Sequence, residues 1–365
     1  MYLVGRSSMK KWLWVFVLFL TACSGSPQES EIDEVESKEA TVTNISPEVI
    51  AENLQIPWSI NKIDNTFYIS ERIGSVMKID AETQSRQKVE LKKPLATAAE
   101  AGLLGFVLAP DFPKTKTAYA YYTYKDDTGQ FNRIITIKLE EDIWIEQEVL
   151  LDKIPSGQVH HGGRLKIGPD GKLYATTGDA ATEPEIAQEV KSLGGKILRM
   201  NLDGTIPEDN PFSDSYVYSY GHRNPQGLAW SDEGTLYESE HGPSAHDEIN
   251  LIKAAGNYGW PVVVGEEKQS GVESPLFQSG ADMTWAPSGM AYHDGKLYVA
   301  TLRGSAVREF DLETKETREV ISGFGRIRDV MIEDGILYFV SNNTDGRGTP
   351  DEKDDRLYKV ELTGF

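Results

Sequence analysis

Cysteine is almost absent from this sequence: among 365 residues there is one, Cys23. A single cysteine excludes an intrachain disulfide, and it excludes every metal site that needs two or more cysteine ligands. Histidine is also scarce, with six in the chain, yet two of them stand side by side at His160 and His161. This pair is therefore a feature that the rest of the sequence has to explain.

Long hydrophobic runs are lacking as well. The apolar stretch at residues 12–20 follows two lysines and is too short for the ~20 residues of a membrane-spanning helix, but it has the length of a signal-peptide core. It ends in Leu20-Thr21-Ala22-Cys23, which resembles a bacterial lipobox. We interpret residues 1–22 as a lipoprotein signal peptide and Cys23 as a lipidated residue that anchors an extracytoplasmic protein to a bacterial membrane. A cleaved secretory peptide with an unrelated cysteine is the alternative.

Positive charge is in short supply, because 57 acidic residues face 37 basic ones and the net charge is −20. Removing residues 1–22 takes away Arg6, Lys10 and Lys11 and no acidic residue, so the net charge of the remaining chain is −23. Such a surface argues against nucleic acid as a partner and against electrostatic adhesion to anionic lipid, so the lipid anchor would be the only membrane contact. Residues 23–46 are rich in serine and glutamate, and we interpret them as a flexible acidic tether.

Helical periodicity is scarce, and residues 183–198 are the one stretch with some. What recurs is a short strand with an aromatic residue near its start, often after an Asp-Gly turn, as in "DGKLYATTGD" and "DGILYFVSNN". Six copies occur, with tyrosines 40 to 63 residues apart, at Tyr68, Tyr119, Tyr174, Tyr237, Tyr298 and Tyr338. Asp-Gly before an alternating strand indicates a hairpin, and about 40–50 residues is typical of a four-stranded blade. The sequence therefore predicts an all-β fold, a six-bladed β-propeller over residues 47–365 whose final strand pairs with the first blade. A β-sandwich is the alternative.

The segments that follow the repeated strands are candidate site segments, because polar groups of a propeller collect where strands end around its channel. His160 and Asp179 lie 19 residues apart, at opposite ends of one glycine-rich hairpin-like unit. A carboxylate beside an imidazole orients the ring and raises its basicity, as a general base requires. A buried pair that only holds the blade together is the alternative. Since neighbours on a strand or its rim point to opposite faces, we expect one of the two histidines in a pocket and the other outside it.

The positively charged candidates in the site segments are arginines. The candidates are Arg223 and the adjacent Asn224 in "YGHRNPQG", Arg303 in "TLRG", and Arg326 and Arg328 in "GRIRDV". Two like charges on one strand face repel unless an anion lies between them, and a guanidinium suits carboxylates. The pattern predicts a polyanionic ligand. The alternative is that each arginine pairs with a local acid, as Arg328 could with Asp329.

The segment "EHGPSAHDEINLI" gathers potential metal ligands: Glu240, His241, His246, Asp247 and Glu248. The zinc pattern HExxH is absent from it. A hard cation such as calcium would accept the backbone carbonyls of Gly242 and Pro243 together with side-chain oxygens. A wide loop without a metal is the alternative.

Seven segments occur in the order "AGLLGFVLAPDF", "HHGGRL", "GGKILRMNLDGTIPEDNPF", "YGHRNPQGLAW", "EHGP…DEINLI…GNYGWP", "APSGMAY" and "RIRDV". Together they resemble the soluble, pyrroloquinoline-quinone (PQQ)-dependent aldose sugar dehydrogenases of the glucose/sorbosone dehydrogenase family. The resemblance spans about residues 47–365, and members of that family have a six-bladed propeller.

The resemblance implies roles for individual positions. They are His160 as general base, Asp179 as the acid that orients it, Arg223 and Asn224 beside the quinone, Arg326 and Arg328 on the cofactor carboxylates, Thr284 as a further contact, and the carbonyls of Gly242 and Pro243 on calcium. Two positions depart from the family pattern: Glu100 stands where well-studied members carry glutamine, and Arg303 where they carry lysine. Glu100 adds a negative charge near an anionic cofactor, which weakens binding unless its carboxyl is protonated or assists the metal.

The implied activity is the PQQ- and calcium-dependent oxidation of aldose sugars at C1 to lactones by hydride transfer. His160 would remove the proton from the anomeric hydroxyl, while Arg223 and calcium stabilise negative charge on the quinone. An external electron acceptor is required, which the sequence does not name, and the oligomeric state stays open. The alternatives are a calcium-dependent propeller lactonase, which has little use for the arginines, and a non-catalytic surface-binding propeller, which takes up no cofactor.

Overall fold

The computed structural model describes residues 46–362. The chain divides into two compact units, Met1–Thr43 and Asn44–Phe365, and the described residues belong to the second. The predicted signal peptide, Cys23 and all but the last residue of the predicted tether lie outside the described residues. No helix within residues 46–362 is long and apolar enough to cross a membrane.

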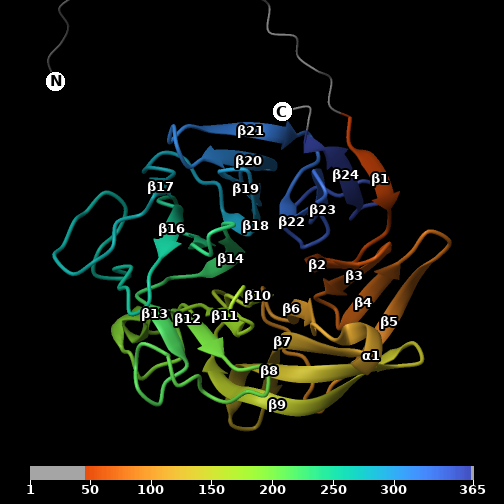
Figure 1. The fold of residues 1–365 in the computed structure, drawn as a ribbon, viewed down its shortest axis with the longest axis horizontal. Coiled ribbons are helices and arrows are strands. Elements are labelled where there is room, and N and C mark those ends of the chain that lie inside the picture. The colour runs from red at the N-terminus through yellow and green to blue at the C-terminus, as the bar shows by residue number, and fades with distance from the viewer. Residues whose placement is uncertain (1–45, 363–365) are drawn as a thin grey trace, which may run out of the picture. The chain divides into compact units, whose positions relative to one another are not determined.

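The described chain is almost entirely β-strand, arranged in five sheets around a common centre (Figure 1). The largest sheet has eight strands in the order β2-β3-β4-β5-β9-β8-β7-β6. Its strands are β2 (Pro57–Ile63), β3 (Thr66–Glu71), β4 (Ser75–Ile79), β5 (Gln84–Glu90), β6 (Leu103–Leu108), β7 (Thr117–Asp126), β8 (Gly129–Glu140) and β9 (Ile143–Pro155).

The other four sheets have four strands each. One sheet consists of β10 (Leu165–Ile167), β11 (Leu173–Thr177), β12 (Lys196–Met200) and β13 (Val217–Tyr220). Another consists of β14 (Pro225–Trp230), β15 (Leu236–Glu240), β16 (Glu248–Ile252) and β17 (Phe277–Gln278). The next is β18 (Pro287–His293), β19 (Lys296–Thr301), β20 (Ala306–Asp311) and β21 (Thr317–Ser322). The last combines β22 (Ile327–Glu333), β23 (Ile336–Ser341) and β24 (Leu357–Glu361) with β1 (Glu48–Ala51).

The eight-stranded sheet consists of two antiparallel four-stranded units, β2–β5 and β6–β9. They are joined where β5 pairs in parallel with β9, and Lys88 is the register partner of Ile143. Six blades in the form of six separate sheets are therefore not confirmed, because residues 46–362 form five sheets. Pairing the two strands protects edges that would otherwise be open to other chains.

The six repeated tyrosines all lie in the second strand of a four-stranded unit, in β3, β7, β11, β15, β19 and β23. The first strands lie nearest the centre (Figure 1), and neighbouring ones contact each other from β14 through β18, β22, β2 and β6 to β10. The repeated strand is thus the second strand of each unit and not the innermost one. Because second and first strands are antiparallel, the segments after the second strands and before the first strands still gather at one end of the units.

The predicted hairpins are present. Asp294 and Gly295 join β18 to β19 with φ of 47° and 75°, and Asp334 and Gly335 join β22 to β23 with φ of 52° and 73°. A two-residue turn of type I′ requires positive φ at both positions, which Asp-Gly adopts at low cost. The final strand does return to the first strand of the described chain, since β24 pairs with β1, with Glu48 opposite Lys359. It completes the last sheet rather than joining β2–β5.

Residues 183–198 form little helix. A 3-10 helix occupies Pro184–Gln188, and β12 begins at Lys196 after two glycines. The other helix, α1 (Phe112–Thr115), is a single turn.

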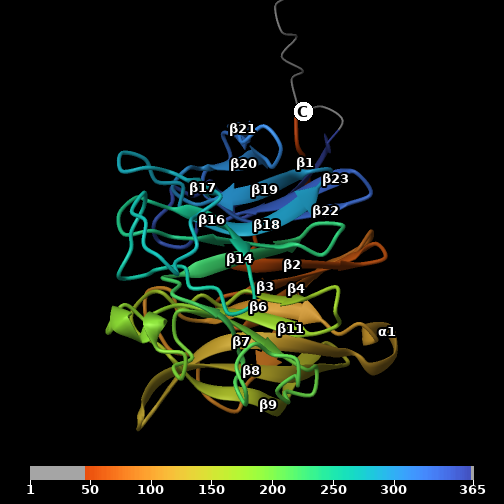
Figure 2. The ribbon, with the colours of Figure 1, turned by 60° about the vertical axis from the view of Figure 1, so that its left-hand side comes forward.

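A buried ion pair connects the first strands of different units near the centre. In this pair an Arg164 nitrogen lies 3.1 Å from Asp329 of β22. The same guanidinium donates to the Gln226 carbonyl of β14 and to Ser59 Oγ of β2, so one side chain links three first strands. Figure 2 shows these strands from the side.

Candidate active site

His160 and Asp179 lie in contact, as the sequence predicts. His160 is in the β9–β10 loop, Asp179 follows β11, and His160 Nδ1 lies 2.7 Å from Asp179 Oδ1. Asp179 Oδ2 accepts the indole N–H of Trp260 at 2.8 Å. Burial raises the pKa of Asp179, but the hydrogen bond and charge of His160 outweigh it and hold the pKa below its usual range. An ionised carboxylate thus fixes Nδ1 of the ring, and the His160 side chain remains 15% exposed.

Glu100 lies beside this pair, in the β5–β6 loop. Its Oε2 accepts the backbone N–H of His160 at 3.1 Å, and its Oε1 lies 2.6 Å from Arg347 Nη1. Burial acts to raise the pKa of Glu100, yet the bond and charge of Arg347 and the His160 N–H lower it to about 2. Glu100 is therefore ionised, and the alternative of a protonated carboxyl is not supported.

His161 is buried and lines an inner cavity together with Glu100 and Arg328, whereas His160 is absent from the lining of that cavity, so it is the second histidine of the pair that enters this pocket. The two histidines sit in a loop, where His160 has a φ of 60°, and strand alternation does not apply. His161 Nδ1 lies 3.2 Å from Ser156 Oγ, and its Nε2 has no partner in the described chain. Burial lowers the pKa of His161 to about 4.

Arg223 and Asn224, between β13 and β14, join the same site. The Arg223 carbonyl accepts the N–H of Asp179, and its guanidinium lies 5.2 Å from the centroid of the Trp260 ring. Asn224 Oδ1 accepts the N–H of Gly162. The buried Arg223 Nε and Asn224 Nδ2 have no partner within residues 46–362. Both residues thus offer donors that nothing in the described chain uses.

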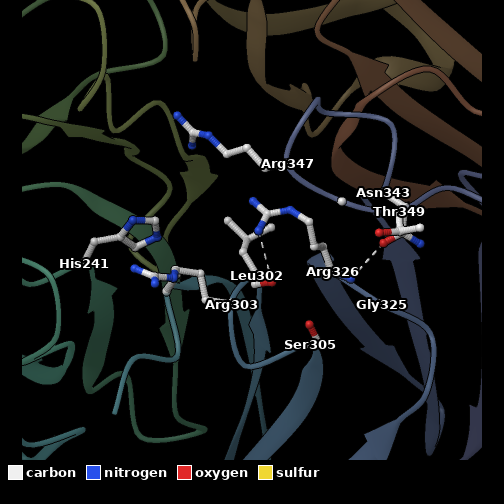
Figure 3. Close-up of a pocket in the computed structure, with 11 residues that line it drawn as sticks. His241, Leu302, Arg303, Ser305, Gly325, Arg326, Asn343, Arg347 and Thr349 are labelled. Carbon is white, nitrogen blue, oxygen red and sulfur yellow. Dashed lines mark hydrogen bonds between the residues drawn. The ribbon is translucent and has the colours of Figure 1, made fainter. Parts of the chain in front are cut away.

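Two of the arginine candidates, Arg303 and Arg326, line an outer cavity of about 640 Å³ together with Arg347 and His241 among others (Figure 3). Arg303 is exposed, and its side chain has no hydrogen bond or ion pair within the described residues. Arg326 does pair with a local acid, since its Nε and Nη2 lie 3.0 and 2.8 Å from Asp345 Oδ2. For Arg326 the alternative interpretation is therefore partly right.

Arg328 extends into the inner cavity, and its proposed pairing with Asp329 is wrong, because successive strand residues face opposite ways and Asp329 pairs with Arg164. Arg328 Nη1 donates to Gln226 Oε1 at 2.8 Å, and the buried Nε has no partner in the described chain. Burial and the nearby Arg72 lower the pKa of Arg328 to about 9. A buried cation without a carboxylate partner is what an anionic ligand would stabilise.

Gly242 and Pro243 line a third cavity with Arg223, Trp260 and His241. Asp247 holds this loop, because its Oδ1 accepts the Gly242 N–H and its Oδ2 accepts the hydroxyl of Thr284 at 2.8 Å. Thr284 thus lies next to the loop, but it is absent from the lining of these three cavities, and its hydroxyl is already engaged. The structure places Thr284 as a support of the site.

Several residues that line the site were not predicted in these positions, and Arg347, Trp260 and His241 are the ones that bear on its chemistry. Arg347 lines both arginine-rich cavities, Trp260 bonds Asp179, and His241, considered only as a possible metal ligand, lines all three cavities. The signal for Arg347 was its place in "SNNTDGRG", after the sixth repeated strand. Trp260 comes from the long β16–β17 connection, which no repeat marks.

A buried acidic cluster adjoins the site. Ligand atoms of His222, Glu238 and Glu240 lie within 4.8 Å of one another, and such a set could hold a cation. His222 Nδ1 lies 3.1 Å from Glu240 Oε1, and burial raises the pKa of Glu238 well above its usual value. Glu240 was a predicted candidate ligand; the alternation of Glu238 and Glu240 on β15 was the signal that could have added the second glutamate.

Comparison with known proteins agrees with this geometry. Residues 54–353 match the Glucose / Sorbosone dehydrogenase family, a class of oxidoreductases. The chain belongs to this family of sugar-oxidising enzymes.

Among relatives, quinoprotein glucose dehydrogenase B of Acinetobacter calcoaceticus is 36% identical over 272 residues, which are 66% of this chain and 57% of that protein. Aldose sugar dehydrogenase YliI of Escherichia coli K12 is 29% identical over 347 residues, 84% of this chain and 92% of that protein. The structure of the PQQ-bound aldose sugar dehydrogenase of Streptomyces coelicolor superposes with a TM-score of 0.80 at 36% identity, covering 87% of this chain and 98% of that one.

Proposed function

We propose that this protein is a PQQ- and calcium-dependent dehydrogenase that oxidises aldose sugars at C1, and that its six four-stranded units are the blades of a six-bladed propeller. The observation that carries the proposal is the His160–Asp179 pair together with Arg223, Arg303 and Arg328, which line the cavities and have no ion-pair partner within residues 46–362. A hydrolase such as a lactonase would have no use for these cations, and a binding module would have no use for the oriented histidine.

The residues present fit PQQ, a flat quinone with three carboxylates. The two cavities that Arg347 lines also expose Arg303 and Arg328, neither of which has a carboxylate partner within residues 46–362. The unpartnered Nε of Arg328 and of Arg223 would gain acceptors. The Streptomyces enzyme was solved in a PQQ-bound form, which supports the same cofactor here.

The Gly242–Pro243 loop fits a calcium ion. The Gly242 carbonyl receives no hydrogen bond in the described chain, and the Pro243 carbonyl accepts one, from Ala245. Carbonyl oxygens are ligands that a hard cation prefers, and a bound Ca²⁺ would add positive charge beside Arg223.

The chain's own residues would carry the proton chemistry. His160 accepts the proton of the sugar hydroxyl at Nε2, since Asp179 holds Nδ1, and the ionised Asp179 stabilises the imidazolium that results. Arg223, stacked near Trp260, supplies fixed positive charge where negative charge develops. When bound, PQQ supplies the acceptor for the two electrons and the hydrogen that leave C1. Loss of hydrogen from C1 of a cyclic aldose gives a lactone.

The first test is dye reduction by the purified protein with PQQ, Ca²⁺ and a panel of aldoses. We expect turnover that needs both additives. The variant His160→Ala should lose about 10²- to 10⁴-fold in turnover while still binding PQQ. His293→Ala, in the β18–β19 hairpin, is the matched control and should keep wild-type rates. Full turnover by cofactor-loaded His160→Ala would rule out this base.

We also propose that Cys23 is lipidated and carries the enzyme to the outer side of a bacterial membrane. In cells fed labelled palmitate, the wild type should be labelled and found with membranes. Cys23→Ala should be unlabelled and released, and label that persists in this variant would contradict the proposal.

A further inference from the structure

The Glu100–Arg347 ion pair spans the site. Glu100 lies in the β5–β6 loop and Arg347 in the β23–β24 loop, and they are 247 positions apart in the chain. The pair lies where the two cavities meet, because Arg347 lines both and Glu100 lines the inner one. Figure 3 shows Arg347 among the residues around the outer cavity, together with Arg303 and Arg326.

Glu100 is held firmly by groups other than Arg347. Arg72 donates to the carbonyls of Ala99 and Ala101, on either side of Glu100, at 2.7 to 3.1 Å. The backbone N–H of His160 holds Oε2. Glu100 therefore stays beside the base and inside the cation-rich cavity whether or not Arg347 is present.

A lone carboxylate at this place opposes an anionic cofactor. At the few ångströms that separate groups lining one cavity, like charges in a partly buried site repel strongly. Arg347 cancels this charge at 2.6 Å. The chain thus combines a glutamate that repels the ligand with an arginine that neutralises it.

We infer that Arg347 is a positioning residue that acts through Glu100. It neutralises Glu100, so that the outer cavity of about 640 Å³, which Arg347 also lines, accepts a polyanionic quinone although a carboxylate lies where the two cavities meet. The inference rests on the proposed function. It explains how a glutamate beside the base is compatible with an anionic cofactor.

The Glu100–Arg347 ion pair should contribute little to the free energy of unfolding. The Arg347 side chain is 49% exposed, and exposed ion pairs contribute little to unfolding free energy. Breaking the pair should therefore affect cofactor binding much more than folding. A purely structural role would show the opposite.

The experiment measures the Kd for PQQ in the presence of Ca²⁺, by quenching of protein fluorescence, for the full-length protein and three variants. Arg347→Gln leaves Glu100 unpaired and should raise the Kd at least about tenfold. Glu100→Gln should bind as tightly as the wild type or more tightly. The double variant Glu100→Gln/Arg347→Gln should return to within about threefold of the wild type.

Arg318→Gln is the matched control, because Arg318 is 55% exposed, pairs with Glu309 and lies on β21, outside the site. It should leave the Kd unchanged. Thermal unfolding without cofactor should place all variants within a few degrees of the wild type, which separates weak binding from poor folding.

A double variant as weak as Arg347→Gln would overturn the inference and assign Arg347 to direct contact with the cofactor. An unchanged Kd in Arg347→Gln would overturn it as well. If the wild-type protein itself fails to bind PQQ, the proposed function is wrong. If the wild type binds PQQ but the double variant does not recover the wild-type Kd, the inference about Arg347 is wrong and the proposed function stands.

Discussion

At the scale of single residues, the site depends on which charges have partners. His160 and Asp179 could be predicted together because one hairpin-like unit separates them, so local geometry nearly determines their contact. The partner of Arg326 could not, since Asp345 belongs to the next loop but one in sequence, and adjacency suggested the wrong acid for Arg328. The pairing of Glu100 with Arg347 carries no signal in local sequence at all.

Two buried histidines predict acid sensitivity. Burial lowers the pKa of His161 and of His241 to about 4, against 6.5 for an ordinary histidine. Between these values the unfolded chain binds protons that the folded one does not, so unfolding free energy should fall as pH drops from 6.5 to 4. Each histidine contributes at most about 1.4 kcal/mol per pH unit. Unfolding free energies measured by chemical denaturation between pH 4 and 6.5 should depend less steeply on pH in His161→Leu than in the wild type. An unchanged pH dependence would contradict the lowered pKa of His161.

At the scale of elements, strands and hairpins were predictable and connections were not. Asp-Gly turns and alternating residues define β19 and β23 by local chemistry alone. The apparent helical period of residues 183–198 is overridden because paired glycines and the pairing of β12 with β11 favour an extended chain there. Trp260 reaches Asp179 from a long connection, whose path depends on tertiary contacts.

The Gly242–Pro243 loop should depend on Asp247. The carboxylate accepts N–H groups of Gly242, Trp285 and Ala286 and the hydroxyl of Thr284. Asp247→Asn puts an amide donor against one of these donors and should loosen the loop. We expect the Ca²⁺ concentration for half-maximal dye reduction to rise about 10- to 100-fold, as for other residues that orient metal ligands. Asp232→Asn, in the β14–β15 turn, should have no effect, and equal shifts in both variants would contradict this role.

At the scale of the whole described unit, the sequence indicated six related units and a returning final strand. It could not indicate that β5 and β9 join two of the units into one sheet, because outer edges carry no repeat signal and meet only when neighbouring units are placed. The buried Arg164–Asp329 pair is likewise a property of the assembled centre. It brings together a cation that precedes β10 and a carboxylate of β22, which are distant in sequence.

The pairing of β1 with β24 in the last sheet is testable by truncation. Deleting residues 1–51 removes β1 and leaves the edge of β24 unpaired, whereas deleting residues 1–45 keeps β1. The shorter deletion should match the wild-type melting temperature. The longer one should melt several degrees lower and aggregate, since an exposed edge invites pairing with other chains. Equal melting temperatures would show that β1 is dispensable.

The pairing of β1 with β24 also sets the order of events when the chain is made. Glu48 meets Lys359 only after more than three hundred further residues have been synthesised, so the last sheet stays incomplete until the end of the chain is available. Such distant contacts slow folding. We expect the ring, and with it the loops that hold Glu100 and Arg347 together, to form only after the whole chain has left the ribosome.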